Sequence, residues 1–291
     1  MSKCLVTGGA GFVGSAVVDA LIEAGHDVTV IDNFSAGQEK NLNPSANLII
    51  DDILTVDWNK LLKYDYVFHL AAIPRVQYSI EHPLETNEAN VKGTLLVLEY
   101  CRRVSAKIIF SSSSSIYKGE DLPTKEDDEK YPRSPYALHK YVSERYIQLY
   151  HELFGLDYAI LRYFNVYGER GSAKGSYPLV IALFLDQKRK GLPLTITNDG
   201  EQRRDFTYVK DVAQANVLAM NWTGEYNIGA GSNMSVNELA EIIGGETKNI
   251  GERKGEPLAT EADNTKATKA GWQQTTTPHE WIKKQLNENF L

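Results

Sequence analysis

The sequence predicts an α/β fold in which helices cover both faces of a doubly wound parallel sheet, with a smaller lobe towards the C-terminus. Short apolar runs, typical of buried parallel strands, alternate with helical patterns from residue 3 to residue 163. A glycine-rich turn joins the first predicted strand to the first predicted helix. Beyond residue 168 the alternation becomes irregular, which indicates a separate lobe.

Composition limits the possible classes of protein. The 291 residues are enough for one large domain or for two lobes that share an interface, and 42% apolar and 24% charged residues are ordinary for a globular enzyme. The formal charge of −7 and the lack of a basic stripe argue against a nucleic-acid partner.

No apolar run is long enough to span a membrane and no signal peptide is visible, so we expect a cytoplasmic protein with no membrane partner. Cys4 and Cys101 lack metal-ligand spacing, and we expect reduced core residues and no metal site.

The first three predicted elements form a βαβ unit. Lys3–Thr7 is typical of a buried strand, a helical pattern begins at Val13, and Asp27–Ile31 predicts a second strand that ends at Asp32. The glycines of the first turn fit two nested spacings, Gly9-x-Gly11-x-x-Gly14 and Gly8-x-x-Gly11-x-x-Gly14. Such glycines let the backbone approach a pyrophosphate at a helix N-terminus. A carboxylate at Asp32 can accept hydrogen bonds from the adenosine ribose and disfavours a 2′-phosphate, so the sequence predicts a Rossmann-type NAD site.

The following elements continue the same rhythm up to the lobe. Further strands are predicted at Asn47–Asp52, Tyr64–Ala72, Lys107–Phe110 and Tyr158–Arg162, with a helix at Thr86–Arg103. His69 lies inside an apolar strand, which favours a satisfied core histidine over a catalytic one. We expect residues 1–168 to bind the dinucleotide, with 209–230 packing back onto them, and residues 169–208 and 231–291 to form a substrate-binding lobe. In this irregular part we expect helices at Leu179–Arg189, Val209–Met220, Val236–Ile243 and Thr277–Leu286, and strands at Pro193–Thr197 and Glu225–Ile228.

A tyrosine and a lysine stand four residues apart on a helix that is predicted to begin at Ser134-Pro135. Tyr136 and Lys140 therefore share one helical face, near the serine run 111–115 that follows a predicted strand. Tyrosine ordinarily has a pKa of about 10, and a nearby ammonium and an oxidised nicotinamide ring would lower it enough to make a base for a hydroxyl group. The spacing alone also fits a half-buried aromatic ring beside a solvated lysine.

Eight motifs in this order resemble those of the extended short-chain dehydrogenase/reductase family, most closely the UDP-hexose 4-epimerases. They are TGGAGFVG (7–14), DN (32–33), HLAA (69–72), SSSSSIY (111–117), SPYALHK (134–140), RYFNVYG (162–168), RRDFTYV (203–209) and GEPLATEADNTKA (255–267). The resemblance covers nearly the whole chain. It implies NAD as the cofactor, a UDP-sugar as the substrate, and a homodimer formed through helices around Thr86–Arg103 and Tyr136–Phe154.

The resemblance also implies roles for individual residues. Tyr136 would be the base, Lys140 would orient the nicotinamide ribose and tune Tyr136, and Ser113 would bind the reacting O4. Cofactor contacts are also implied for Gly8, Gly11, Phe12, Val13, Gly14, Asp32, Asn33, Asp52, Ile53, Leu70, Ala71, Ala72, Asn90, Ser111 and Tyr163. Substrate contacts are implied for Ser113, Ser115, Tyr136, Asn165, Arg204, Arg253 and Thr260, with the two arginines on the diphosphate. Arg203 is interpreted as a solvated charge.

The reaction follows from what the serine run lacks. Related dehydratases and UDP-glucuronate decarboxylases carry carboxylates where Ser114 and Ser115 stand here, so the resemblance implies 4-epimerisation of UDP-glucose and UDP-galactose. Tyr136 would take the O4 proton while C4 passes its hydride to NAD, and the hydride would return to the opposite face of the turned sugar. Alternatives are a nucleotide-sugar 4-ketoreductase, another sugar-nucleotide-modifying member of the family, and a dinucleotide-sensing regulator.

Three positions bear on specificity and loop shape. Thr260 aligns with a gating position, where a small residue would admit N-acetylhexosamines, although a surface threonine is an equal alternative. Lys118 stands where the family usually has glycine, and the segment 235–263 is short for the family.

Overall fold

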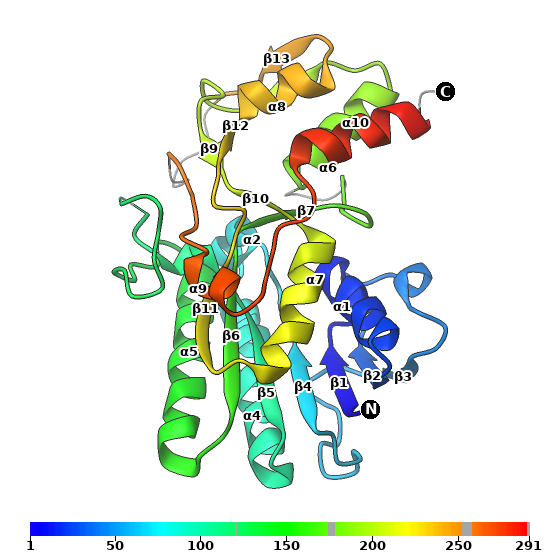
Figure 1. The fold of residues 1–291 in the computed structure, drawn as a ribbon, viewed down its shortest axis with the longest axis vertical. Helices are drawn as coiled ribbons and strands as arrows, with labels where there is room; N and C mark the ends of the chain where they lie inside the picture. The colour runs from blue at the N-terminus through cyan, green and yellow to red at the C-terminus, as the bar shows by residue number, and fades with distance from the viewer. Residues whose placement is uncertain (120, 174–177, 252–257, 290–291) are drawn as a thin grey trace.

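A computed structural model describes residues 1–119, 121–173, 178–251 and 258–289 (Figure 1). Its centre is a parallel sheet of seven strands in the order β11-β6-β5-β4-β1-β2-β3. The strands are β1 (Lys3–Thr7), β2 (Asp27–Asp32), β3 (Asn47–Ile50), β4 (Tyr66–His69), β5 (Lys107–Ser113), β6 (Tyr158–Tyr163) and β11 (Gly224–Ile228). This order reverses beside β1, which confirms the predicted doubly wound fold.

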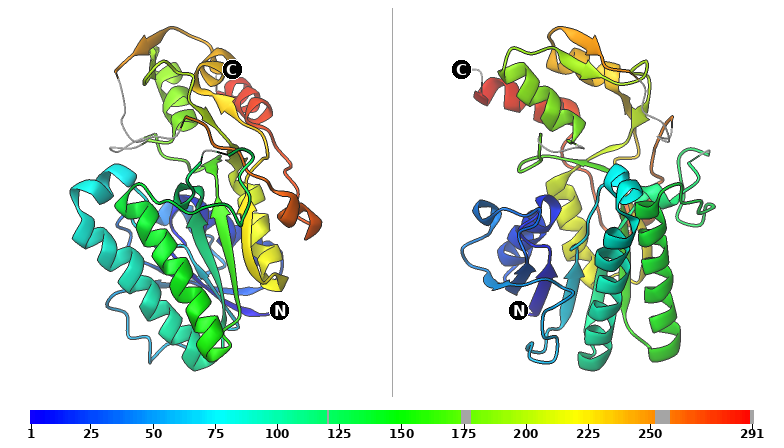
Figure 2. Two further views of the ribbon diagram at one scale, coloured as in Figure 1. Left: turned by 90° about the vertical axis from the view of Figure 1, so that its left-hand side faces the viewer. Right: turned by 180° about the vertical axis from the view of Figure 1, so that it is seen from behind.

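Helices cover both faces of the sheet (Figures 1 and 2). On one face, α1 (Phe12–Glu23) and α7 (Val209–Leu218) pack over Cys4 and Val6. On the other face, α4 (Gly93–Val104) and α5 (Pro135–Phe154) pack over Leu5. Because successive side chains of a strand alternate between its faces, the buried run of β1 supplies both cores at once.

Several predicted boundaries change in the structure. β4 ends at His69 rather than at Ala72, and β3 ends at Ile50, so Asp52 lies in the loop that follows. β5 extends three residues beyond the prediction, to Ser113. The predicted helix at Thr86–Arg103 is instead divided into α3 (Pro83–Asn87), a π-helical segment η2 (Glu88–Lys92) and α4. π-helical turns are frequent at functional sites, and this one carries Asn90.

The smaller lobe lies beyond the carboxyl ends of the strands (Figure 1). Its core is formed by α6 (Val180–Arg189), β8 (Leu194–Ile196), α8 (Val236–Ile243) and α10 (Pro278–Asn289), and its buried side chains include Phe184, Leu239 and Trp281. Three short strand pairs complete this region: β7 (Asn165–Tyr167) with β10 (Phe206–Tyr208), β9 (Arg203–Arg204) with β12 (Met234–Ser235), and β8 with β13 (Thr247–Asn249). The remaining elements are η1 (Glu39–Asn41), α2 (Val76–Glu81), η3 (Ser114–Ile116), η4 (Ala219–Asn221) and α9 (Thr265–Lys269).

Part of the predicted lobe returns to the sheet. Ala267 of α9 and the fully buried Trp272 belong to the core cluster beneath α1 and α7, not to the core of the lobe. Just before them, Ala262 pairs with Thr124 in a loop that follows the serine run. In that loop Lys118 forms an ion pair with Glu129 at 3.4 Å. Within the described ranges, no helix is long and apolar enough to cross a membrane.

Candidate active site

The glycine turn is packed so tightly that two of its positions accept only glycine. Gly8 has φ +74°, and a Cβ there would lie 2.7 Å from the backbone nitrogen of Ala71. A Cβ on Gly14 would lie 2.1 Å from the carbonyl oxygen of Gly8. Helix α1 begins at Phe12, after Gly11 as a cap that has no side chain, so Gly14 lies in its first turn. The first N–H groups of a helix have no acceptor within the helix, so this turn fits the pyrophosphate of a dinucleotide.

Asp32 joins the glycine turn to the loop after β2. Its side chain is 7% exposed, and its two carboxylate oxygens accept hydrogen bonds from the backbone N–H of Ala10 at 2.9 Å and of Phe34 at 2.8 Å. Each carboxylate oxygen can accept more than one hydrogen bond, so Asp32 keeps acceptor capacity for ribose hydroxyls. Beside it, the amide of Asn33 donates to Asp52 Oδ2 at 2.7 Å. Ile53 is buried, with its Cδ1 only 2.5 Å from where a Cβ on Gly93 would be.

Asn90 uses its side-chain amide on the protein itself. Its Oδ1 accepts from the backbone N–H of Ile73 at 2.7 Å, and its Nδ2 donates to the carbonyl of the same residue at 3.1 Å. These bonds fix the segment after β4, which contains Leu70, Ala71 and Ala72. Asn90 therefore shapes the predicted cofactor edge through the backbone of Ile73.

His69 is a satisfied core histidine, as the sequence predicted. Its ring is buried between the hydroxyls of Thr7 at 2.8 Å and Thr94 at 3.0 Å. Burial, with a smaller contribution from the positive charge of Lys140, lowers the pKa of His69 to about 3. A neutral ring held between two hydroxyl groups has a structural role.

This lowered pKa predicts a pH-dependent stability. The folded state keeps His69 neutral, whereas the unfolded chain binds a proton below the ordinary pKa of 6.5, so the free energy of unfolding falls as pH drops from 6.5 towards 3. The expected contribution is about 1.4 kcal/mol per pH unit. Urea denaturation at several pH values in this range gives the free energy of unfolding. We expect this free energy to fall less steeply with falling pH in His69→Gln than in wild type, and His279→Gln, at an exposed site, is the control. If the pH dependence of the free energy of unfolding in His69→Gln equalled that of wild type, His69 would not be its source.

The three predicted catalytic side chains meet at the carboxyl end of β5. Helix α5 begins as predicted, because the Ser134 hydroxyl accepts a hydrogen bond from the N–H of Ala137 at 3.2 Å. The half-buried Tyr136 is hydrogen-bonded to the Ser113 side chain. Lys140 Nζ donates to the carbonyl of Ser111 at 2.6 Å and lies 6.0 Å from the centre of the Tyr136 ring.

Burial shifts the pKa values of both Tyr136 and Lys140. It raises the pKa of Tyr136 to about 12, while the hydrogen bond to Ser113 acts in the opposite direction. Burial also lowers the pKa of Lys140 to about 8, opposed by the negative charge of Glu144. Desolvation dominates at the phenol, and the predicted lowering by a nicotinamide ring applies only when the cofactor is bound.

Three of the predicted substrate residues, Asn165, Arg204 and Thr260, lie next to Asp205. Asn165 is exposed on β7, and the hydroxyl oxygen of Ser115 is buried without a hydrogen-bond partner among the described residues. Arg204 is largely buried, and its Nη1 donates to the carbonyl of Arg203 at 2.9 Å. The Thr260 hydroxyl accepts from the backbone N–H of Asp205 at 3.2 Å. Arg253 lies outside the described residues.

Tyr163 and Arg203 both have side-chain partners within the protein that the sequence did not indicate. Tyr163 is buried, and its hydroxyl is hydrogen-bonded to the side chain of Asn216 at 3.0 Å, so its polar end faces α7. Arg203 is not simply a solvated charge, because its guanidinium pairs with Glu238 at 2.9 Å.

Sequence reasoning missed several residues that shape the site. The Ser79 hydroxyl accepts a hydrogen bond from the backbone N–H of Tyr136 at 3.0 Å. Asp205, whose pKa burial raises to about 6, accepts from the N–H groups of Ala230, Gly231 and Ala262. Glu144 and Arg162 form a buried ion pair. Arg162 lies within the apolar run of β6, and this position indicates a buried ion pair, because a buried charge needs a partner. No metal-binding cluster of acidic, histidine or cysteine side chains occurs in the described parts of the chain.

Comparisons with known proteins identify the family. The model of the NAD dependent epimerase/dehydratase family matches residues 4–229. The chain belongs to this family. Membership confirms the predicted family, and NAD as the cofactor that the glycine turn and Asp32 fit.

Three relatives illustrate the similarity. A candidate UDP-glucose 4-epimerase of Methanocaldococcus jannaschii is 44% identical over 296 residues, covering 97% of each chain. The structure of UDP-N-acetylglucosamine 4-epimerase from Methanobrevibacter ruminantium, in complex with UDP-N-acetylmuramic acid, matches with a TM-score of 0.93 and 37% identity over 99% of each chain. The structure of Thermus thermophilus UDP-glucose 4-epimerase, in complex with NAD, matches with a TM-score of 0.89 and 32% identity over 96% of each chain.

Proposed function

We propose that this protein is an isomerase that inverts C4 of a UDP-hexose through a transient 4-keto sugar, with NAD retained throughout. The observation that carries the proposal is the hydrogen-bonded pair of Tyr136 and Ser113 beside Lys140. This group lies at the same edge of the sheet as the glycine turn and Asp32. The similar proteins named above are 4-epimerases of UDP-sugars or a candidate for that activity.

Each catalytic side chain has a distinct task in this reaction. Tyr136 takes the proton from sugar O4 and returns it after the sugar has turned. Ser113 hydrogen-bonds to O4 and keeps it near the phenol. Lys140 places a positive charge on the same helical face, which favours the phenolate. When bound, NAD supplies the acceptor and donor of the C4 hydrogen and a positive charge that opposes the effect of burial on Tyr136.

The cofactor would be held by the carboxyl ends of β1 to β5. The glycine turn and the first N–H groups of α1, at Phe12 and Val13, bind the pyrophosphate. Asp32 binds the adenosine ribose, with Asn33, Asp52 and Ile53 nearby. The segment after β4, Ser111 and Lys140 would hold the nicotinamide half.

The substrate would be covered by residues 169–208 and 231–291. Asn165 and Arg204 lie where the lobe meets the sheet, and a guanidinium suits the diphosphate because its planar fork matches phosphate oxygens. We assign Arg253 to the same task from sequence alone.

Epimerisation is favoured over the other reactions of this fold by Ser114 and Ser115. Dehydration or decarboxylation would need an acid where these hydroxyls stand. A test uses the purified protein without added cofactor and UDP-glucose as the substrate. We expect interconversion with UDP-galactose, no steady change in reduced-nicotinamide absorbance, and NAD released only on denaturation. Net consumption of the reduced cofactor would instead identify a 4-ketoreductase.

Thr260 is proposed to set the sugar size, with N-acetylhexosamines accepted. Its small side chain lies beside β9, and the relative from Methanobrevibacter ruminantium is a UDP-N-acetylglucosamine 4-epimerase. We expect Thr260→Tyr to lower kcat/KM for UDP-N-acetylglucosamine at least about tenfold more than for UDP-glucose, because the ring would fill the space of the N-acetyl group. Thr260→Ser, which keeps the hydroxyl bonded to Asp205, is the control. Equal losses for both sugars would refute this assignment.

We also propose a cytoplasmic homodimer. Helix α5 exposes Leu149, Leu153 and Phe154, at 40%, 63% and 52%, in its last turns, and a second copy of the chain could cover them. Cys4 and Cys101 are buried and unpaired, as expected in a reducing compartment. Sedimentation equilibrium tests the dimer, and a monomer at all concentrations would contradict it.

A further inference from the structure

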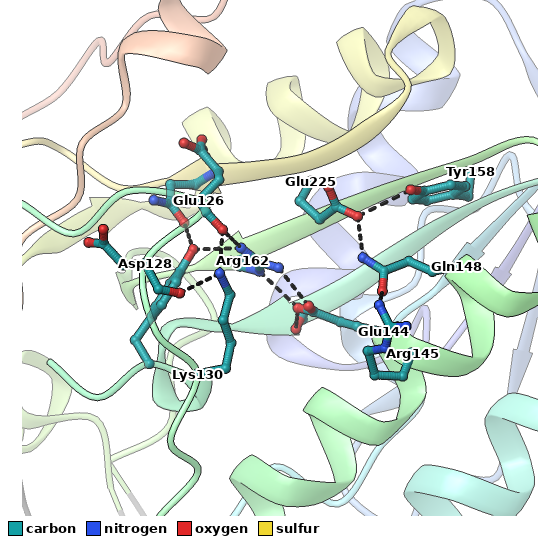
Figure 3. Close-up of polar contacts among 12 residues, drawn as sticks. Glu126, Asp128, Lys130, Glu144, Arg145, Gln148, Tyr158, Arg162 and Glu225 are labelled. Atoms are coloured by element: carbon teal, nitrogen blue, oxygen red, sulfur yellow. Dashed lines mark hydrogen bonds and ion pairs between the residues drawn. The ribbon is translucent and has the colours of Figure 1, made fainter.

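A buried polar network lies directly beneath the catalytic side chains. Ser112 and Arg162 are register partners on β5 and β6, and they are 3% and 2% exposed. Ser112 shares its face of the sheet with Phe110, which packs in the cluster beneath α4 and α5. Figure 3 shows Arg162 between Glu144 of α5 and the loop that carries Glu126.

The inner arm of this network joins α5 to the strand that carries Ser113. The Ser112 hydroxyl donates to Glu144 Oε1, which also accepts from Arg162 Nε at 3.0 Å, while Arg162 Nη2 donates to Glu144 Oε2 at 2.8 Å. Glu144 follows Lys140 by one helical turn, and Ser112 precedes Ser113 by one residue. The inner arm therefore fixes how far α5 can slide or tilt relative to β5.

The outer arm joins the same arginine to a segment that leads into the lobe. Arg162 Nη1 donates to the hydroxyl of Tyr117 at 2.8 Å, and this hydroxyl donates to Asn227 Oδ1 at 2.7 Å. Asn227 Nδ2 then donates to the carbonyl of Thr124 at 2.9 Å. The backbone N–H of Asp263 donates to the same carbonyl at 2.8 Å. This arm ends three residues from Thr260.

We propose that Arg162 and Glu144 are positioning residues whose two arms set two different parts of the active site, an inference that rests on the proposed epimerase function. The inner arm sets the distance between Ser113 and the pair Tyr136 and Lys140. The outer arm holds residues 258–263 against the site. Reacting groups lose rate steeply when they are misplaced by about 1 Å, so the inner arm governs kcat. The outer arm governs the binding of substrate, because it ends at Asp263, close to Thr260, and makes no hydrogen bond to Ser113, Tyr136 or Lys140.

Two substitutions separate the arms without leaving a buried charge unpaired. Ser112→Ala keeps the Arg162–Glu144 pair and removes only the bond to β5, so we expect kcat to fall about tenfold with KM within about twofold of wild type. Tyr117→Phe keeps the ring and removes only the hydroxyl, so we expect KM to rise about fivefold with kcat within about twofold.

A matched control removes a buried hydrogen bond elsewhere. Tyr100→Phe removes a bond to the carbonyl of Leu62. It should lower the melting temperature and leave kcat and KM unchanged. The proposal is overturned if Ser112→Ala and Tyr117→Phe behave like this control, or if both lower kcat and raise KM to the same extent.

Hydrogen exchange tests the inference without any assay of activity. We expect Ser112→Ala to speed amide exchange in residues 113–117, and Tyr117→Phe to speed it in residues 124–130 and 261–263. The reverse pattern, or no change in either segment, would overturn the two-arm assignment. If wild type turned over no UDP-sugar, the proposed function would fail. The exchange pattern would still show whether the inner arm and the outer arm each hold their own segment.

Discussion

Replacement of Tyr136 by phenylalanine is expected to lower kcat for UDP-sugar interconversion by about 10³-fold or more. The substitution keeps the ring that packs at the start of α5 and removes only the hydroxyl bonded to Ser113. Proton transfer to and from sugar O4 then has no positioned group in the described site.

The measurement is steady-state epimerisation across a range of pH values. Tyr150→Phe is the matched control, since Tyr150 lies on the same helix, where its hydroxyl donates to Glu99 at 2.6 Å. The control should keep wild-type kcat, and Tyr136→Phe should retain wild-type binding of NAD. Near wild-type interconversion by Tyr136→Phe would show that Tyr136 is not the base.

Replacement of Arg162 by methionine is expected to lower the free energy of unfolding by about 3–5 kcal/mol. Glu144 is 1% exposed, and without the guanidinium its charge would stay buried with the Ser112 hydroxyl as its one side-chain donor among the described residues. Removing both charges in Arg162→Met with Glu144→Leu should recover most of this loss, because the cost comes from the unpaired carboxylate.

Urea denaturation of the two variants separates these possibilities. The single variant should also regain stability relative to wild type as pH falls. An unpaired buried carboxyl has a pKa raised above that of the unfolded chain, so its protonation favours the folded state at low pH. Equal losses in the single and double variants, with no dependence on pH, would contradict this account of the pair.

The elements that the sequence predicted well are those set by local pattern. The βαβ unit around Asp32 and the start of α5 at Ser134 follow from strand runs, glycines and a capping residue within a few positions of each other. The π-helical turn at Asn90 was missed because its cause is a tertiary one: the amide binds the backbone of Ile73, seventeen residues away. The return of Trp272 to the sheet likewise depends on contacts between distant segments.

The candidate site shows the same division. The structure brings Tyr136, Lys140 and Ser113 together because Ser113 ends β5 and the other two lie in the first turns of α5, and their roles stay predictions. The sequence does not reveal how deeply the phenol of Tyr136 is buried, so it did not indicate that burial raises the pKa of this group, and the lowering by a bound nicotinamide stays a prediction. Arg162 was read only as part of a strand, and its partners Glu144 and Tyr117 come from other segments.

The central claim is tested most directly by following the hydrogen on C4 of the sugar. UDP-glucose deuterated at C4 is incubated with the purified protein in ordinary water, with no cofactor added, and the products are analysed by NMR. We predict UDP-galactose that keeps its deuterium at C4. Loss of the label to water, or a product with C4 unchanged, would contradict the account.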